Sequence, residues 1–427
     1  MTKPESFPNQ DKPCLSWSLA MWQDYLQAIH PKNIEMGLER CQQVLVNMAI
    51  DLSHSKIITV AGTNGKGTTC RMIEQGLLTA NHTIAVYSSP HLVDYKERLR
   101  IDGVMLSDAE HIAAFMQVEQ ARQSVSLTFF EFATLAALAL IANNRPEYVL
   151  LEVGLGGRLD AVNIIDPDMA VITSIDLDHQ DWLGDSRAQI AIEKAGIMRP
   201  LITVVIGEPD PPDTLLEQVQ QFEANAFWQG QDFSYQQHQH DWSWRNDEFQ
   251  LNNLPLPSIP MQNASTALQV LGLLKINLQQ EWVVSLIEDT QLPGRFQTIS
   301  SQPTIVLDVA HNPQATRYLA TKIAQQDYQS LHLVVAMLGD KDIASSLSPL
   351  QPFNATWHVA SLDVPRGADH SQIKSVLNPT QTVLEFKEVW QAYESALEQA
   401  KVDDLIIVFG SFFTVSQVMQ KRANRTT

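Results

Sequence analysis

The chain has 427 residues, more than one hydrophobic core usually fills, so two domains are expected. Its 44% hydrophobic and 18% charged residues predict a globular protein, and its formal net charge of −19 disfavours nucleic acid or an anionic membrane as a partner, since both need clustered Lys and Arg. The three cysteines are widely spaced and form no CxxC pair, which predicts a reducing compartment and no structural zinc site. No apolar run approaches about 18 residues, so we expect a cytoplasmic protein.

The chain starts with a polar segment, residues 1–13, that lacks the apolar core of a signal peptide. Helical spacing follows over 17–29 and 34–50, with a break at His30-Pro31.

A β-branched apolar run at 57–61 leads into glycines, and a helical pattern resumes after Thr69. A polyphosphate needs bare backbone N–H groups and a helix N-terminus close to it, with a lysine for charge and a hydroxyl for Mg²⁺. Lys66 and Thr68 have these positions, so the stretch is predicted to be a P-loop. The predicted ATP-binding residues here are Gly62, Thr63, Asn64, Gly65, Lys66, Gly67 and Thr68. Because Val60 replaces the first Walker glycine, a generic NTPase is disfavoured, and the alternative is a glycine-rich turn with a solvated lysine.

Polar residues end the next two strands. The strand 83–87 stops at Ser88-Ser89, and the strand 148–152 ends in Glu152, followed by glycines. In open α/β sheets ligands bind at the carboxyl ends of the strands, and carboxylates are the oxygen ligands of hard cations. Glu152 is therefore a predicted Mg²⁺ ligand. The alternatives are that Ser89 belongs to a turn stopped by Pro90, and that Glu152 only closes its strand.

Several further polar residues have both a structural and a functional interpretation. Thr128 and Glu131 have capping-box spacing at the start of an apolar helix, 127–142. His179 follows the strand 169–174, with Asp176 and Asp178 as acidic neighbours, and would ordinarily satisfy a turn. Lys194, in the helix 187–198, would ordinarily be solvated, and Asn263 is a helix N-cap candidate.

A Pro-Gly pair before Arg295 marks the domain boundary. We expect a first domain at 1–293, a linker at 294–301 and a second domain at 302–427. Strands at 304–309, 331–337, 356–360 and 405–409 alternate with helical segments, which indicates a second α/β unit. Its first strand ends at Asp308 and His311. The segments 209–212 and 220–253 are expected to be loop-rich, without an identifiable catalytic group.

The P-loop stretch and the run 148–161 resemble the Mur ligase and folylpolyglutamate synthase superfamily, and the resemblance extends in order from Trp17 to Met419, with a weak part at 209–253. The extra glycine, Gly67, is typical of the folate branch. The resemblance implies an α/β fold with an N-terminal P-loop, Mur-ligase-like domain and a smaller Rossmann-like C-terminal domain. It also implies ATP-dependent ligation of L-glutamate to dihydropteroate, or to a folate already bearing glutamate, by a monomer using ATP and two Mg²⁺ ions.

The same resemblance assigns residue roles. Asn263, Arg295 and Asp308 join the P-loop in binding ATP, Ser89, Glu152 and His179 bind metal, and Lys194 is a lysine carbamylated by CO₂. Lys66, Lys194, His179 and Glu152 form the implied catalytic set. The implied pterin-binding residues are Glu35, Met36, Gly37, Thr128, Phe129, Phe130, Glu131, Leu159, Asp160 and Ala161. Several relatives have His where Phe413 stands, which leaves the role of that position open.

Two alternatives stay open. A Mur-type peptide ligase acting on a UDP-sugar is disfavoured by Gly67 and by the short segment that precedes the P-loop strand. A regulatory GTP-binding switch is suggested by the DxxG form at 181–184, but no NKxD motif for guanine is found. For a ligase, an acyl phosphate intermediate is expected, since amide formation from a carboxylate is uphill and needs ATP.

Overall fold

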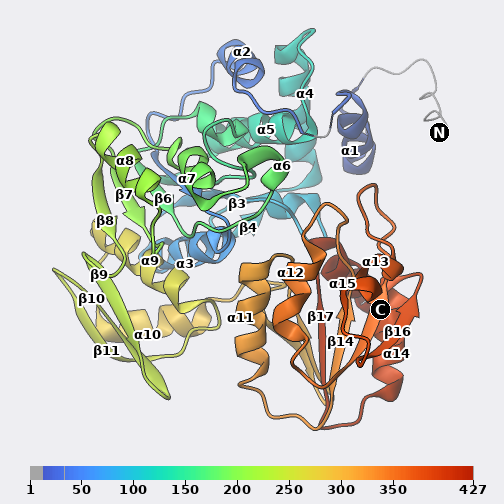
Figure 1. Ribbon diagram of the computed structural model, residues 1–427. Helices are drawn as coiled ribbons and strands as arrows, with labels where there is room; N and C mark the ends of the chain where they lie inside the picture. The colour runs from blue at the N-terminus through green and yellow to red at the C-terminus, as the bar shows by residue number, and fades with distance from the viewer. Residues whose placement is uncertain (1–12, 33, 427) are drawn as a thin grey trace.

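The fold comes from a computed structural model that describes residues 13–32 and 34–426 (Figure 1). Most of the polar start at 1–13 lies outside the described residues, as does Asn33.

An eight-stranded sheet forms the centre of the first domain, in the order β4-β3-β2-β5-β1-β6-β7-β8. Its strands are β1 (Lys56–Ala61), β2 (Ile84–Tyr87), β3 (Leu99–Ile101), β4 (Val104–Met105), β5 (Tyr148–Glu152), β6 (Met169–Ile172), β7 (Thr203–Ile206) and β8 (Asn225–Trp228). All neighbours pair in parallel except β3 and β4 at one edge. The central strands are buried on both faces, which explains their continuous apolar sequences.

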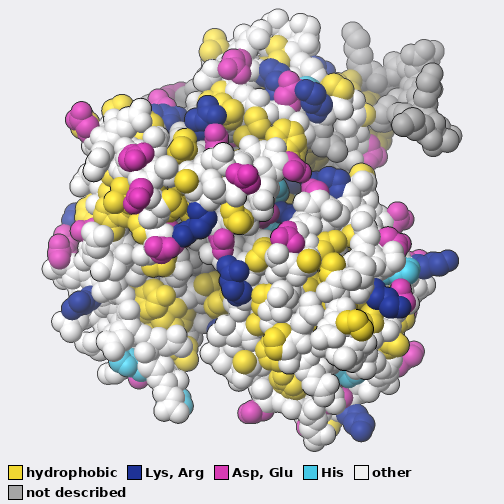
Figure 2. All heavy atoms as spheres, viewed as in Figure 1, with side chains coloured by type: hydrophobic (Ala, Val, Ile, Leu, Met, Phe, Trp, Pro, Cys, Tyr) yellow, Lys and Arg dark blue, Asp and Glu magenta, His cyan; other side chains and the backbone are white. Residues whose placement is uncertain are grey.

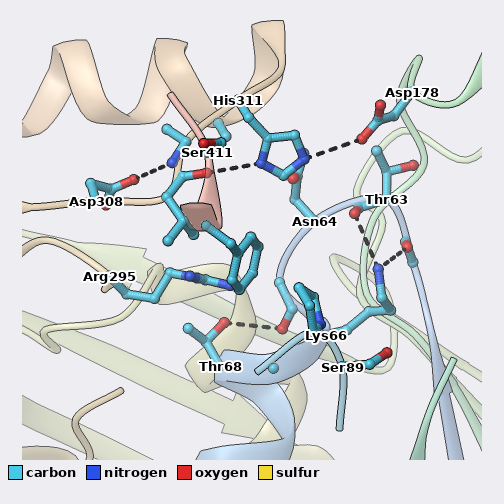
Figure 3. A pocket seen from close by; sticks show the side chains of 18 of the residues that line it. Thr63, Asn64, Lys66, Thr68, Ser89, Asp178, Arg295, Asp308, His311 and Ser411 are labelled. Atoms are coloured by element: carbon cyan, nitrogen blue, oxygen red, sulfur yellow. Dashed lines mark hydrogen bonds and ion pairs between the residues drawn. The ribbon is translucent and has the colours of Figure 1, made fainter. Parts of the chain in front are cut away.

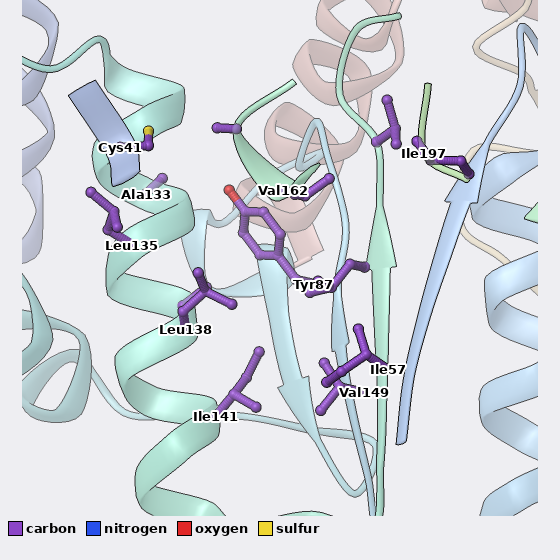
Figure 4. Close-up of a cluster of buried hydrophobic side chains, with 14 of the residues drawn as sticks. Cys41, Ile57, Tyr87, Ala133, Leu135, Leu138, Ile141, Val149, Val162 and Ile197 are labelled. Atoms are coloured by element: carbon purple, nitrogen blue, oxygen red, sulfur yellow. The ribbon is translucent and has the colours of Figure 1, made fainter. Parts of the chain in front are cut away.

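Helices cover both faces of this sheet. One face packs on α1 (Leu19–Ala28), α2 (Glu39–Met48), α4 (Asp108–Arg122), α5 (Phe129–Asn144), α7 (Arg187–Ala195) and α8 (Asp213–Gln221), and the other on α3 (Lys66–Thr79), α9 (Met261–Leu273) and α10 (Gln280–Asp289). Short helical segments are η1 (Tyr95–Arg98), η2 (Ala161–Ile164) and α6 (Gln180–Leu183). Figure 4 shows Leu138 and Ile141 of α5 facing Tyr87 and Val149 of the sheet. Because α5 is buried almost all round, its sequence is apolar on every side.

The second predicted helix begins later than expected. Residues 34–38 are not helical, and α2 starts at Glu39. The backbone of Gly37 has φ +146, which is incompatible with a helix, and the partly exposed Glu35 side chain accepts hydrogen bonds from His30 and Arg40.

The expectation of a loop-rich segment at 220–253 was wrong. Beside β8, it contains the three-stranded antiparallel sheet β9 (Phe233–Gln237), β10 (Asp241–Asn246) and β11 (Gln250–Pro255). Trp242 and Trp244 are buried against the core from β10, while Ser243 between them is less buried. The abundance of polar residues on the outer face concealed this period-two pattern.

The C-terminal domain is a six-stranded sheet in the order β12-β13-β17-β14-β15-β16. Its strands are β12 (Gln297–Ser301), β13 (Thr304–Leu307), β14 (Leu331–Val335), β15 (Ala355–Ala360), β16 (Thr382–Phe386) and β17 (Leu405–Phe409). One face packs on α11 (Pro313–Ile323), α12 (Ile343–Leu347), η3 (Ser348–Leu350) and α13 (His370–Val376), the other on α14 (Val389–Gln399) and α15 (Phe412–Thr426).

Most of the segment expected as a linker, 294–301, is strand β12. It pairs antiparallel with β13 and is the edge strand of the second sheet. The chain therefore enters the C-terminal sheet by Gln297.

In the part of the chain that the structure describes, no helix has the length and apolar character needed to cross a bilayer. Figure 2 shows acidic and basic side chains interspersed over one face of the molecule.

Candidate functional site

A cavity of about 860 Å³ lies between the two domains. The loops after β1, β2, β5 and β6 line it from the N-terminal domain, and the loops after β13, β14 and β17 line it from the C-terminal domain. Its charged or polar lining includes Lys66, Ser89, Glu152, Asp178, His179, Lys194, Asn263, Arg295, Asp308, His311, Lys341 and Ser411. Figure 3 shows side chains from both domains pointing toward one another across it.

The predicted P-loop joins β1 to α3 and lines the cavity from Gly62 to Thr68. Gly65 is the N-cap of α3 with φ +85, and a Cβ on it would lie 2.4 Å from Asn263 Oδ1. The Lys66 ammonium donates to Gly62 O at 2.9 Å and to Thr63 O at 3.3 Å, so it lies over the loop. Unpaired amides at the start of α3, together with this lysine, make an anion site.

Thr68 and Asn263 are joined inside this site. The Asn263 side-chain amide donates to Thr68 Oγ1 at 2.8 Å, and the Thr68 hydroxyl donates to Gly65 O at 3.0 Å. Both side chains are buried. Asn263 lies at the third position of α9 rather than at its N-cap, which is Pro260, so the N-cap interpretation is wrong.

Glu152 ends β5 beside the P-loop. It is buried, and burial raises the pKa of its carboxyl while the charges of Lys66 and Arg295 counteract the rise. A hydrogen bond from the Ser89 backbone also favours the ionised form. A Cβ on Gly67 would lie 3.7 Å from Glu152 Oε1, so this carboxylate faces the first turn of α3.

These residues fit a divalent cation held together with phosphates. Among the described residues, no three His, Cys, Asp or Glu side chains come together as a complete set of metal ligands. A carboxylate and hydroxyls beside a phosphate site suit Mg²⁺, which keeps waters and phosphate oxygens among its ligands.

Asp178 and His179, in the loop after β6, meet the C-terminal domain. Asp178 Oδ1 accepts from Lys341 Nζ at 2.5 Å, and its Oδ2 accepts from Asn312 Nδ2 at 3.1 Å. Burial acts against ionisation, but the His311 imidazole, whose Nε2 lies 3.6 Å from Oδ2, and the charge of Lys341 hold the pKa of Asp178 below its usual range. Burial lowers the pKa of His179 to about 4, so its imidazole is neutral at pH 7 and able to act as a metal ligand.

Sequence reasoning missed the partners of these residues. Lys341 follows β14, and Asn312 follows β13, so both are polar residues just beyond the carboxyl end of a strand. That signal was available, as it was for Ser89 and Glu152. Asn64 and Asn312 also bond reciprocally through their side-chain amides, at 3.1 and 3.0 Å, and so join the P-loop to the C-terminal domain.

Lys194 lines the same cavity from α7 and is 3% exposed. Burial, and then the charge of Lys66, lower the pKa of its amine to about 7. The expectation of a solvated lysine was therefore wrong.

Arg295 and Asp308 reach the cavity from the domain junction. The Arg295 guanidinium lies 4.9 Å from the Phe412 ring and donates to Gly294 O at 3.3 Å. Asp308 accepts from the backbone N–H groups of Phe296 and Ala310, both at 2.8 Å, so it shapes the loop that carries Arg295. Burial raises the pKa of Asp308, and Arg295 opposes the rise. Phe413 lines the cavity and is 45% exposed.

The predicted pterin-binding residues are not among the residues that line this cavity. They gather behind the turn 154–157 that follows Glu152. Asp160 accepts from Leu155 N at 2.7 Å, and burial raises the pKa of Asp160 to about 6. Thr128 and Glu131 form the expected capping box at the start of α5. The remaining members of the set are Glu35, Met36, Gly37, Phe129, Phe130, Leu159 and Ala161, and their role stays a prediction.

The P-loop faces a second α/β domain across a cavity that contains buried arginine, lysine and carboxylate groups. This arrangement defines a Mur-type ligase, an ATP-dependent enzyme that joins an acid to an amine. Comparison with known families agrees. Residues 60–276 match the Mur ligase middle domain, and residues 294–412 match the Mur ligase, glutamate ligase domain.

Individual relatives narrow the class. The dihydrofolate synthase/folylpolyglutamate synthase of Escherichia coli (strain K12) is 43% identical over 403 residues, covering 94% of this chain and 95% of the relative. The structure of E. coli FolC in complex with DHPP and ADP superposes with a TM-score of 0.93 at 42% identity, covering 97% of this chain and 100% of that one. A bifunctional folylpolyglutamate synthase/dihydrofolate synthase with Mn, AMPPNP and L-glutamate bound gives a TM-score of 0.90 at 44% identity, with coverage of 97% and 100%. The chain belongs to the dihydrofolate synthase/folylpolyglutamate synthase family of Mur ligases.

Proposed function

We propose that this chain joins L-glutamate to dihydropteroate, and to folates that already carry glutamate, at the expense of ATP. The observation that carries the proposal is that the P-loop of one domain and Arg295, Asp308 and Lys341 of the other line the same cavity. Support also comes from relatives of this fold that have been solved with ADP and DHPP, or with AMPPNP, Mn and L-glutamate.

Amide formation from a carboxylate needs a better leaving group than oxide. In the proposed reaction the carboxylate oxygen attacks the γ-phosphorus of ATP, the bond to the β,γ-bridging oxygen breaks, and ADP leaves. The amine of glutamate then attacks the acyl phosphate carbon, a proton is lost from nitrogen, and phosphate leaves. Negative charge grows on oxygens in both steps, so catalysis depends on positioned cations and N–H donors.

The residues of this chain have distinct roles in that scheme. The amides of the P-loop and Lys66 hold the β- and γ-phosphates, and Arg295 approaches the transferring group from the domain junction. Asn263 fixes Thr68, while Asp308 fixes the loop of Arg295. Bound divalent cations supply further charge neutralisation, and Ser89, Glu152 and His179 would hold them.

We assign Lys194 as the site of a carbamate. Its buried amine has a pKa of about 7, so a neutral fraction is present at physiological pH. The amine nitrogen attacks CO₂, a C–N bond forms and a proton is released, which leaves a carboxylate in the cavity that Ser89, Glu152 and His179 also line. The pterin ring is assigned to the region behind the turn 154–157, and the enzyme is expected to act as a monomer.

Product analysis tests the proposal. Purified protein is incubated with ATP, Mg²⁺, L-glutamate and dihydropteroate, and separately with tetrahydrofolate in place of dihydropteroate. ADP release that requires both the acid and glutamate, with a product heavier by one glutamyl residue in the mass spectrum, is the expected result. ADP release without a glutamylated product, or a product formed only from a UDP-sugar acid, would overturn it.

A further inference from the structure

Arg40 joins two segments that are far apart in the sequence. It lies in the first turn of α2, and its guanidinium donates to Glu131 Oε1 from Nε at 3.1 Å and from a terminal nitrogen at 2.7 Å. It also donates to Glu35, to the carboxylate at 3.0 Å and to the backbone carbonyl at 2.9 Å. One planar group therefore fixes the segment 34–38 on the first turn of α5.

The Glu35 carboxylate extends this connection. Its second oxygen accepts from His30 Nε2 at 3.0 Å, and His30 Nδ1 lies 2.8 Å from Ser126 Oγ, just before α5. Glu35 and Glu131, both predicted to bind the pterin, are thus already paired within the protein. Glu131 is buried, and Arg40 is the cation that compensates its charge.

Both segments held by Arg40 form a wall beside the cavity. A Cβ on Gly154 would lie 2.7 Å from the Phe130 ring, and a Cβ on Gly156 would lie 3.7 Å from the terminal methyl of Met36. Gly154 and Gly156 line the cavity directly after Glu152. The position of segment 34–38 relative to α5 therefore sets the space next to the predicted metal ligand.

We propose that Arg40 is a positioning residue for the pterin-linked acid, because it holds Met36 and Phe130 at the spacing that the acid needs. The inference rests on the proposed function. Arg40 is not among the described residues that line the cavity, and its side-chain hydrogen bonds go to Glu35 and Glu131, so its effect is expected on the acid rather than on ATP.

The matched control is Arg122. It is also a partly buried arginine of the same domain, with bidentate bonds to Glu119 and bonds to the Tyr25 hydroxyl and to Val125 O, but it bonds to neither Glu35 nor Glu131. Its side chain is 14% exposed, against 24% for Arg40. Arg40→Met and Arg122→Met remove comparable ion pairs from different places.

The experiment measures steady-state kinetics and hydrogen exchange for both variants. For Arg40→Met we expect the KM for dihydropteroate to rise about tenfold or more, while the KM for ATP changes less than about twofold. Exchange at the amides of 34–38 should become faster, and Arg40→Lys should recover part of the affinity. Arg122→Met should change neither the KM values nor exchange at 34–38.

Three results would overturn the inference: an unchanged KM for dihydropteroate in Arg40→Met, equal changes in the KM for acid and ATP, or the same KM shift in Arg122→Met. If Arg40→Met fails to fold, Glu35→Gln is measured instead, because it weakens the bond between Arg40 and Glu35 from the more exposed residue. The same KM results are then expected, and the same ones would overturn the inference. Failure of the proposed function is distinguishable, because wild-type protein would then release no acid-dependent ADP at all.

Discussion

Replacing Gly65 by alanine tests the P-loop geometry most sharply. The added methyl would lie 2.4 Å from Asn263 Oδ1 and 2.7 Å from its amide nitrogen, and the residue would have to keep φ +85. A left-handed backbone costs a non-glycine residue about 1–2 kcal/mol. Displacing Asn263 leaves its buried bond to Thr68 unmade, which costs roughly 1–3 kcal/mol. We therefore expect a loss of about 2–5 kcal/mol in the free energy of unfolding.

Asn263→Ala separates these two costs. Alone it loses the bond to Thr68, about 1–3 kcal/mol. In the double variant the new methyl no longer meets Asn263, so the combined loss should fall below the sum of the single losses by about 1–3 kcal/mol. Urea unfolding gives the stabilities, and calorimetric titration should show at least a roughly tenfold weaker ATP affinity for Gly65→Ala. The close approach of residue 65 to Asn263 would be refuted if the two single losses of stability added to the double loss within about 0.5 kcal/mol, or if Gly65→Ala left the ATP affinity unchanged.

Three further predictions concern the cations of the site. Lys66→Ala should lower kcat/KM for ATP at least about a hundredfold, with little change in melting temperature. ADP-release kinetics measure the first quantity and thermal scans the second. A small loss in kcat/KM would contradict the role of Lys66 in holding phosphate. A chelator should abolish ATP turnover, and Glu152→Gln should raise the Mg²⁺ concentration for half-maximal rate about tenfold or more, whereas an unchanged Mg²⁺ dependence would exclude Glu152 as a ligand. The pKa of Lys194 falls from 10.5 to about 7 on folding, so between these values the unfolded chain binds the extra proton and stability rises with pH. In CO₂-free buffer, the free energy of unfolding of wild type, measured by urea titration, should therefore rise by roughly 2–3 kcal/mol relative to that of Lys194→Met between about pH 7.5 and 9.5. Parallel pH profiles of the two proteins would show that the amine is not buried as described.

The conformation of the P-loop and its place at the cavity could be predicted because its residues are neighbours in the sequence. Gly65, Lys66 and Thr68 are neighbours on one turn, and a strand that ends in Glu152 places its carboxylate at a known edge of a parallel sheet. The buried parallel strands could also be predicted from local sequence, because each of them is a continuous apolar run.

The contacts between domains could not be predicted in this way. Asp178 and Lys341 are 163 residues apart, and Asn64 and Asn312 are 248 residues apart, so only the folded arrangement brings them together. The sequence places each of them in a loop after a strand, but it does not show which loops face one another across the two domains. The same limit applies to Arg40: the resemblance assigns Glu35 and Glu131 to the pterin, and the sequence does not show that both carboxylates pair with this arginine.

The acyl phosphate is the central claim, and isotope transfer tests it most directly. Dihydropteroate labelled with oxygen-18 in both carboxylate oxygens is turned over with ATP and L-glutamate, and the inorganic phosphate is analysed by mass spectrometry. Because one carboxylate oxygen leaves with the phosphoryl group, each phosphate released should carry one labelled oxygen. Phosphate without label, formed together with glutamylated product, would contradict the account.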